Sequence, residues 1–555
     1  MAATYLISEC LENVLLNLLD ENPSGDTRTY TSTKDLYSCS LVSRNWCRIS
    51  TPLLYAYPFH HFRHLAYSNI HYINSNINYS SYFKLIRTLL SCIPKYEIEQ
   101  ILSNSSTNEQ NPSPNPFVSN GISAFHNNLL TTFNYINFIR GLIFDKILYK
   151  TYELFQYREI WYSTYISNDT TRDQFSKISI LIMNHFIKYL CTHCNNLTTL
   201  EFPFKIQDNE FLINIIESLK FNDYNRKNKL YNLKELYYIS NKYGKYGEIC
   251  SSADDLYSVL SNKICNLNLL YNDKINSIEE ANSLSQFISL QKNLKHIILS
   301  ENIYNLEQIY NDDIIDDNYN IIIESLSTQS ESLQILEFNH IPFNRISEKG
   351  LNSLYLLKNI RELRFCRCKD INDNLNSWAK NLTKLKVLEF GAYYFPMNSE
   401  DFLIQLIKSS NSLCKLVLDY KREQDQGFQL FKQIPNYLHS LIHLELPKIF
   451  LSELILIFKS CTRLVYLSMI LSGDKLWEGN FSNLGKFTPK TLRKIQLKGI
   501  ENLVFNSNEL KYFFKECVNN DSNLKYLGIV KNCDDLINQE YFDIAKEFGV
   551  ELIIV

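Results

Sequence analysis

The sequence contains little glycine, and the short motifs that depend on glycine are missing. Only 14 of its 555 residues are glycine, and no Gly-x-Ser-x-Gly, Gly-x-Gly-x-x-Gly or Gly-x-x-x-x-Gly-Lys segment occurs. These segments place a backbone turn against a nucleophilic serine or a phosphate group. Without them the sequence supports neither nucleotide chemistry nor serine hydrolysis. We therefore expect a non-catalytic protein that needs no cofactor.

The chain also lacks a strong net charge and a long apolar run. Its formal net charge is −3, which gives no reason to expect a nucleic-acid partner. No apolar run reaches the roughly 18 residues that a membrane span needs. The first twenty residues lack the basic start of a secretory signal. We therefore expect no membrane partner and a location in the cytoplasm, the nucleus or both.

Cysteine is scattered along the chain and does not form a framework. The closest pairs are Cys191 with Cys194 and Cys366 with Cys368, and neither has a second pair nearby to complete a zinc site. We therefore expect no metal. Cys194 and Cys461 each stand three residues before a repeated leucine motif, where small core residues fit, so we expect buried, reduced thiols.

One pattern is abundant, and it organises more than half of the chain. Thirteen segments follow Leu-x-x-Leu-x-Leu, with starts spaced by about 29 residues on average. They begin at Leu197, Leu233, Ile264, Leu294, Leu333, Ile360, Leu385, Leu413, Leu441, Leu464, Leu492, Leu524 and Val550. The segment from Ile139 to Phe144 fits the same window and predicts an earlier, degenerate repeat.

This pattern resembles the leucine-rich repeat family over residues 191–555. The fourth and sixth residues of each window point to one side of an extended strand, and the segments between windows, such as 399–410, have helical spacing. Strands stack about 4.8 Å apart and helices about 10 Å apart, so an array of such units must curve. The predicted fold class is therefore α/β, a horseshoe-shaped solenoid with parallel strands inside and helices outside.

The family also places an Asn or Cys eight residues after the first leucine, where the side chain hydrogen-bonds the turning backbone. Five windows keep such a residue, and the others depart from the pattern. The five are Asn241, Asn272, Asn302, Cys368 and Asn532.

The third and fifth residues of each window should lie on the inner strand face. In the first window of the series these residues are Thr199 and Glu201. Acidic residues modestly outnumber basic ones along this face, which favours a binding site for a target-protein segment with basic and apolar features. An ordinary solvated strand face explains the same pattern equally well. The residues that we expect to bind the target are Glu337, Glu362, Arg364, Glu389, His443 and Glu445.

The N-terminal residues carry a different pattern. Ser32 and Asp35 have the spacing of a capping box and predict a helix from about Thr33. Along this helix an apolar stripe is expected to run continuously through Leu36, Cys39, Val42, Trp46 and Ile49. An earlier helix over "SECLENVLLNLLD" should share a small core with it. So small a pair buries too little surface to be stable alone, so we expect it to lean on a partner.

The order of these residues, from about 5 to 57, resembles the F-box, through which substrate receptors dock onto the Skp adaptor of cullin–RING ubiquitin ligases. "LISE", from Leu6 to Glu9, stands where the family has Leu-Pro-x-Glu, and residues 41–46 contain its Leu-Val-x-Arg-x-Trp intact. Two features depart from the family: Ile7 replaces the proline, and the loop over 20–34 is long. The resemblance implies an adaptor surface made or shaped by Leu6, Ile7, Leu11, Val14, Leu18, Leu36, Val42 and Trp46.

The resulting hypothesis has three regions: an F-box-like domain at 1–58, a linking region at 59–190 and the repeats at 191–555. The segment 103–121 is rich in Asn, Ser and Pro and is predicted to be a disordered insert in the linking region. The resemblance implies a substrate-recognition subunit of an SCF-type ligase, with the Skp adaptor, and through it cullin and a RING subunit, as partners, and an unknown target. The alternatives are a leucine-rich scaffold without a ligase role, whose N-terminal helices cap the array, and an enzyme or enzyme regulator using the inner face.

Overall fold

The computed structural model divides the chain into two compact units, which are described separately. The first unit comprises Met1–Asn272 and Asn276–Lys292, and the second comprises Asp273–Ile275 and Asn293–Val555. The described residues are 8–17, 33–63, 79–94, 96–98, 100, 133–144, 148, 172–194, 196–202, 215–217, 229–238, 252–272, 275, 277–301, 318–394, 399–421, 429–470, 481–500, 505–531 and 537–554. The insert predicted at 103–121 lies outside them. Both predicted region boundaries, at 58 and 190, fall within the first unit.

Three helices begin the first unit, where two were predicted. They are α1 (Ser8–Asn17), α2 (Thr33–Ser40) and α3 (Arg44–Leu54). The prediction of one continuous stripe is wrong because the chain turns after Ser40 and starts a new helix. Ser43 has an extended backbone, and its hydroxyl oxygen accepts the amide of Trp46 at 3.3 Å, as an N-cap does. Val42, in the turn, therefore points away from the stripe and is 55% exposed.

The remaining first-unit elements alternate between strands and helices. The strands are β1 (Gly141–Ile143), β2 (Thr199–Phe202), β3 (Glu235–Tyr238) and β4 (Leu269–Asn272). The helices are α5 (Ser80–Leu90), α10 (Arg172–His193), α12 (Ser252–Ser261) and α13 (Ile278–Ser289). Each strand pairs in parallel with the next along the chain. Strand β1 lies in the segment predicted as an early repeat, and Ile139, Leu142 and Phe144 are all buried.

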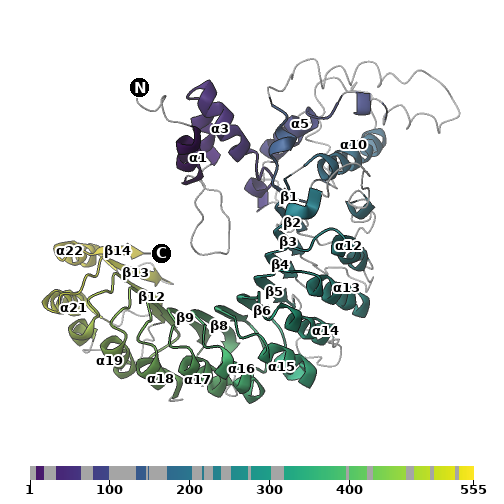
Figure 1. Cartoon of the computed structure of the whole chain (residues 1–555). Helices are drawn as coiled ribbons and strands as arrows, with labels where there is room; N and C mark the ends of the chain where they lie inside the picture. The colour runs from purple at the N-terminus through teal and green to yellow at the C-terminus, as the bar shows by residue number, and fades with distance from the viewer. Residues whose placement is uncertain are drawn as a thin grey trace. The chain divides into compact units, whose positions relative to one another are not determined.

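The second unit continues the same alternation, with ten strands and nine α-helices among its described residues. Its strands are β5 (His296–Ser300), β6 (Ile335–Asn339), β7 (Glu362–Cys366), β8 (Val387–Tyr394), β9 (Lys415–Lys421), β10 (His443–Leu446), β11 (Tyr466–Ile470), β12 (Lys494–Ile500), β13 (Tyr526–Lys531) and β14 (Glu551–Ile554). Its helices are α14 (Asn318–Ser325), α15 (Glu348–Tyr355), α16 (Asn376–Asn381), α17 (Glu400–Ser409), α18 (Gln429–Tyr437), α19 (Leu451–Ser460), α20 (Phe481–Leu484), α21 (Ser507–Asn519) and α22 (Gln539–Glu547). Within this unit the strands line the inner side of a curve, and the labelled helices lie along its outer side (Figure 1). The fold class is α/β, as predicted.

Short 3₁₀ helices fill some of the connections. They are η2 (His60–Phe62), η4 (Tyr135–Phe138), η6 (Lys229–Asn232), η9 (Leu326–Gln329), η10 (Phe343–Arg345), η11 (Asp373–Leu375) and η13 (Gly485–Phe487).

The leucine pattern builds the core between strands and helices. In the window at Leu385, the first, fourth and sixth residues (Leu385, Leu388 and Phe390) are all buried. The sixth residues of three successive windows, Phe338, Phe365 and Phe390, lie with ring centroids 5.8 and 6.2 Å apart. Burial of one such side chain contributes about 1.5–3 kcal/mol, so the pattern supplies most of the packing energy of each repeat.

Backbone hydrogen bonds join most neighbouring repeats by one rule. The carbonyl oxygen of the residue after the first leucine accepts two amides from the following repeat. Arg361, for example, accepts from Lys386 at 2.7 Å and from Val387 at 3.0 Å. The rule keeps the register between neighbouring strands fixed.

Two of the predicted windows are out of register. Leu236 pairs with Leu270, so the repeat predicted from Ile264 begins three residues later, at Leu267. Buried Gln291 explains the shift: its Nε2 donates to the Ile264 carbonyl oxygen and its Oε1 accepts the Leu267 amide, each at 3.1 Å, which holds the intervening residues outside the strand.

The final window is wrong by one residue, which matters because successive strand side chains point to opposite faces. Leu527 pairs with Leu552, so the first position of that window belongs to Gly549 and not to Val550. Gly549 has a φ of +69°, a conformation that glycine adopts without strain directly after α22.

The cysteines that the structure describes form no disulfide, and several occupy the core. Cys194 and Cys461 are fully buried, as predicted. The Cys368 thiol donates to the Phe338 carbonyl oxygen of the preceding repeat at 3.2 Å, which confirms the role predicted for this position in one repeat. The predicted asparagines do not extend the comparison: Asn241, Asn302 and Asn532 lie outside the described residues, and Asn272 belongs to a shifted window.

Candidate functional site

The N-terminal helices surround a small core and expose a set of large apolar side chains. Leu11, Leu15, Leu36 and Leu53 form the core, and Trp46 packs against it half-buried. Leu11 and Leu36, predicted to contact an adaptor or to shape its surface, are fully buried, so they can only shape the surface from within.

The exposed side chains include two of the predicted adaptor contacts. Val14 is 48% exposed and Val42 is 55% exposed. Leu16, Tyr37 and Leu41 are exposed as well, between 42% and 69%. None of these three was predicted to contact the adaptor. Leu41 could have been predicted, because it is the first residue of the Leu-Val-x-Arg-x-Trp motif. Leu6, Ile7 and Leu18 lie outside the described residues.

The residues just after the third helix pair with the first strand of the repeats. The Ala56 carbonyl oxygen accepts the amides of Arg140 and Gly141, at 2.7 and 3.0 Å. The same pair of hydrogen bonds joins most neighbouring repeats, so Ala56 pairs with strand β1 as the residue of a preceding repeat would. The rings of Tyr55 and Tyr135 stack beside it, with centroids 4.2 Å apart. The helical domain is therefore attached to the first strand by backbone pairing.

The next residues of the chain cover the strand face of the first unit. Arg63 Nε donates to Glu201 Oε1 at 2.9 Å, and His60 Nε2 lies 3.7 Å from Glu201 Oε2. The Tyr57 hydroxyl lies 3.2 Å from Thr198 Oγ1. We call residues Tyr57–Arg63 the covering segment.

The covering segment explains why two of the predicted face residues are misplaced. Thr199 and Glu201, expected on an exposed inner face, are 2% and 1% exposed. A buried carboxylate needs paired charge, and the Arg63 guanidinium provides it. The inner face is therefore closed at β1 and β2.

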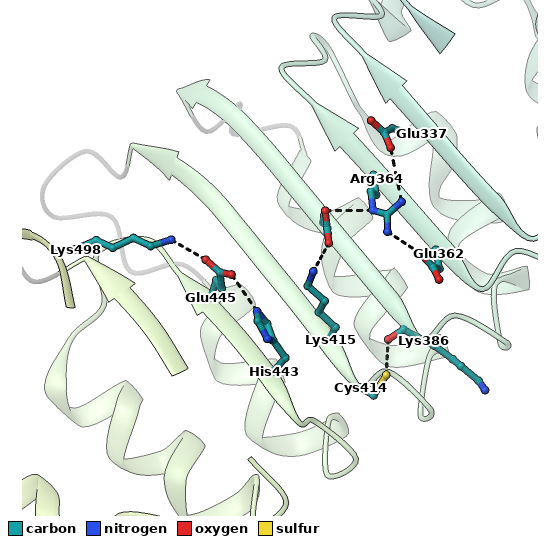
Figure 2. A network of polar contacts seen from close by, with 10 residues as sticks. Glu337, Glu362, Arg364, Lys386, Cys414, Lys415, His443, Glu445 and Lys498 are labelled. Carbon is teal, nitrogen blue, oxygen red and sulfur yellow. Dashed lines mark hydrogen bonds and ion pairs between the residues drawn. The ribbon is translucent and has the colours of Figure 1, made fainter. Parts of the chain in front are cut away.

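The strand face of the second unit is open and holds a network of ion pairs centred on Arg364 (Figure 2). The Arg364 guanidinium contacts Glu362 at 2.6 Å, Glu389 at 3.2 Å and Glu337 at 3.7 Å. Lys415 Nζ lies 2.6 Å from the other oxygen of Glu389. These residues come from β6, β7, β8 and β9, whose register places Glu337, Arg364 and Glu389 side by side in one row. The four members that were predicted to bind a target thus meet in one cluster.

The remaining two predicted residues form a separate cluster on β10. His443 Nε2 lies 3.0 Å from Glu445 Oε1, and Lys498 Nζ donates to Glu445 Oε2 at 2.7 Å (Figure 2). The hydrogen bond with His443, joined by Lys498, lowers the pKa of Glu445 to about 2. The ring of His443 also stacks on Tyr466, with centroids 4.2 Å apart. Glu445 is therefore ionised at neutral pH and held in place.

Burial and charge also fix the state of a histidine next to the Arg364 cluster. His296 begins β5, and its Nε2 atom is buried with no hydrogen-bond partner among the described residues. Burial, aided by the positive charge of Arg364, lowers the pKa of His296 to about 4. The ring is neutral at physiological pH, so it adds no positive charge to the acidic cluster.

Three comparisons place the chain among known proteins. No protein-family model matches the sequence, and no curated protein matches it. Among solved structures, the chain is similar to the leucine-rich repeat-containing protein LegL7 from Legionella pneumophila, at 14% identity and a TM-score of 0.31, over 65% of this chain and 93% of LegL7. A TM-score of this size carries no argument, so the assignment rests on the chain's own register, burial and strand–helix alternation. In sequence pattern, strand pairing and burial the repeats are similar to leucine-rich repeats.

The described residues offer neither a metal site nor a membrane-spanning helix. No group of three or more His, Cys, Asp or Glu side chains within them could hold a metal ion. No helix among them is long and apolar enough to cross a membrane.

Proposed function

We propose that the protein is a non-catalytic substrate receptor of a cullin–RING ubiquitin ligase. In this proposal the N-terminal helices bind an Skp-type adaptor, and the strand face of the second unit binds a target protein. Catalysis would then come from proximity, because the receptor holds the target's lysines near a charged ubiquitin-conjugating enzyme. The leucine-rich repeat architecture supports the coarser part of the proposal, a protein-binding module.

The exposed apolar side chains of the N-terminal helices carry the proposal. A domain whose core is four leucines gains little by leaving Val14, Leu41 and Val42 in water, because each costs stability that burial would recover. Several large apolar side chains exposed on one small domain are typical of a protein-interaction surface. Their order along the chain is the order that resembles the F-box.

The attachment of the helical domain supports the same role. Ala56 joins it to β1 by two backbone hydrogen bonds, and the covering segment joins it to β2 through Glu201. A fixed attachment within the first unit limits the conformational freedom that the helices lose when they bind an adaptor.

The test is capture of a co-expressed Skp adaptor by the full chain and by the double variant Val14→Asp with Val42→Asp. Both side chains are about half exposed, so the change should leave the fold intact while placing charge on the contact surface. Loss of one well-buried apolar contact weakens binding by about tenfold or more. We expect the native chain to capture the adaptor and the double variant to lose at least 90% of it.

A matched control distinguishes this surface from general stickiness. Leu356→Asp with Leu456→Asp also charges two exposed apolar side chains, 53% and 50% exposed, but near α15 and on α19. The control should capture the adaptor as the native chain does, with circular dichroism unchanged in both variants. Failure of the folded native chain to capture the adaptor would reject the ligase role.

One observation favours a second candidate, a leucine-rich scaffold whose N-terminal helices only cap the array. The Ala56 carbonyl pairs the otherwise unpaired amides at the start of β1, and repeat arrays require such a cap. In that case the native chain and the charged double variant should both be stable and should both capture no adaptor.

A further inference from the structure

The first unit shows how this strand face holds an arginine. Glu201 occupies the fifth position of its window, on β2, and the residue paired with it on β3 is Tyr237. Arg63 of the covering segment donates to Glu201 at 2.9 Å, and its guanidinium carbon lies 5.7 Å from the centre of the Tyr237 ring. The strand face therefore binds the charge of the arginine by a carboxylate and its flat surface by a neighbouring ring.

The fit of the covering segment is close. A side chain at Gly141, the face position of β1, would meet His60 Cε1 at 2.8 Å and would meet Tyr57 as well. The segment thus lies directly against the strands, in the place where an extended ligand would lie. It acts as an occupant supplied by the chain itself.

The second unit presents the same row of positions without such an occupant among the described residues. The fifth positions of β6, β7 and β8 are Glu337, Arg364 and Glu389, and the third position of β7 is Glu362. Their side chains are between 21% and 30% exposed, whereas Glu201 is 1% exposed. Three carboxylates on β6–β8 share Arg364 and, from β9, Lys415, so this cluster carries one excess negative charge.

Apolar side chains flank these carboxylates on both sides. Ile335 and Val387 lie on either side of Glu362 in one row, and Ile298 and Val417 end the other row. Strands lie about 4.8 Å apart and an extended chain advances about 3.3 Å per residue, so a segment crossing the strands meets an apolar side chain within about three residues of a central position. The pattern therefore predicts a short ligand motif, with an apolar side chain within about three residues of a central position.

We infer that the strand face over β5–β9 binds an extended segment of the target that carries an arginine between apolar side chains, with carboxylates holding the arginine as Glu201 holds Arg63 in the first unit. This inference rests on the proposed function, because it names the substrate class of the same receptor face. The arginine pairs with Glu337 and Glu362, and the apolar side chains on either side of it cover the isoleucines and valines.

The experiment selects ligands from a library of random 12-residue peptides displayed on phage, with the full chain as bait. The best peptides are then measured by fluorescence polarisation against the native chain and the double variant Glu337→Gln with Glu362→Gln. The control is Glu547→Gln with Asp521→Asn, which also removes two charges; each of these carboxylates pairs with one exposed lysine away from the face. A citrulline in place of the peptide's arginine removes the ligand's charge at constant shape.

We expect enriched peptides to carry an arginine with an apolar residue within three positions on each side. Binding should weaken about tenfold in the face variant and about tenfold with citrulline, and should not change in the control variant. The inference is overturned by enrichment of acidic peptides, by ligands that ignore the two glutamates, or by no enrichment at all. Adaptor capture, measured on the same preparation, reports separately on the proposed function.

Discussion

Gly141 offers the sharpest test of how the covering segment sits on the first unit. In Gly141→Ala the new methyl group would lie 2.8 Å from His60 Cε1 and closer still to the Tyr57 ring. The Tyr57 ring cannot easily retreat, because its hydroxyl lies 3.2 Å from Thr198 Oγ1 and its edge packs against His60, with centroids 5.2 Å apart. The added group must therefore displace the segment.

The expected magnitude follows from two opposing effects. Replacing glycine by alanine at a compatible strand position stabilises a protein by about 0.4–1 kcal/mol, because the unfolded chain loses freedom. Overpacking a filled site costs about 1–3 kcal/mol. We therefore expect a net local destabilisation of about 0.5–2 kcal/mol, which corresponds to roughly 2- to 30-fold faster local opening.

Hydrogen exchange measured by mass spectrometry is the suitable assay, because a chain of two units need not unfold in one step. The amide of Arg140, which donates to Ala56, should exchange faster in Gly141→Ala by the factor given above. In a Tyr57→Ala background the same change should cost less than half as much, since most of the clash is gone. Slower exchange in Gly141→Ala, or an equal cost in both backgrounds, would refute the covered face.

Three further perturbations test other parts of the structure. The pKa of His296 is lowered from 6.5 to about 4, so the folded chain binds this proton less tightly than the unfolded chain. The contribution of His296 to stability should be fully present above pH 6.5 and should fall by up to about 3 kcal/mol toward pH 4. The variant His296→Gln should lose this pH dependence when the urea midpoint is measured against pH. Arg364→Lys keeps the charge but loses the planar fork that reaches three carboxylates, so we expect stability to fall by about 0.5–1 kcal/mol in thermal melts, and an unchanged melting temperature would show that the network contributes nothing. Gly485→Ala would place a Cβ 2.8 Å from the Cβ of Glu516 and closer to the Phe513 carbonyl oxygen, so α21 must shift and the melting temperature should fall. An unchanged melting temperature would mean that α21 can shift at no cost in free energy.

The repeat architecture could be predicted because it depends on local periodicity. Alternation along a strand decides which side chains enter the core, and windows such as the one at Leu385 fit without adjustment. The predicted register was wrong for the windows at Ile264 and Val550. Buried Gln291 decides where the first of these strands begins, and the left-handed backbone of Gly549 decides it for the second. Neither effect has a period in the sequence, so a pattern of leucines cannot show it.

The candidate site was predictable only where contacts lie between neighbouring repeats. Glu337, Glu362, Arg364 and Glu389 were selected from alternation alone, and the strand register then brings them together. Glu201 was misplaced because its partner, Arg63, is 138 residues away and comes from outside the repeats. The break between α2 and α3 was missed because the apolar spacing continues across the turn that Ser43 caps.

The two strand faces differ in a way that burial energetics explains. Glu201 is almost wholly removed from water, and removing Arg63 would leave a buried charge uncompensated, so Arg63 cannot be exchanged cheaply for an outside ligand. The carboxylates around Arg364 keep about a quarter of their surface in water, where an ion pair contributes little and can be remade with another cation. The carboxylate–arginine pair is therefore permanent over β2, whereas the pairs over β6–β8 can be replaced by pairs with a ligand. A ligand that competes for these glutamates needs only to supply a cation and to cover the apolar side chains beside them.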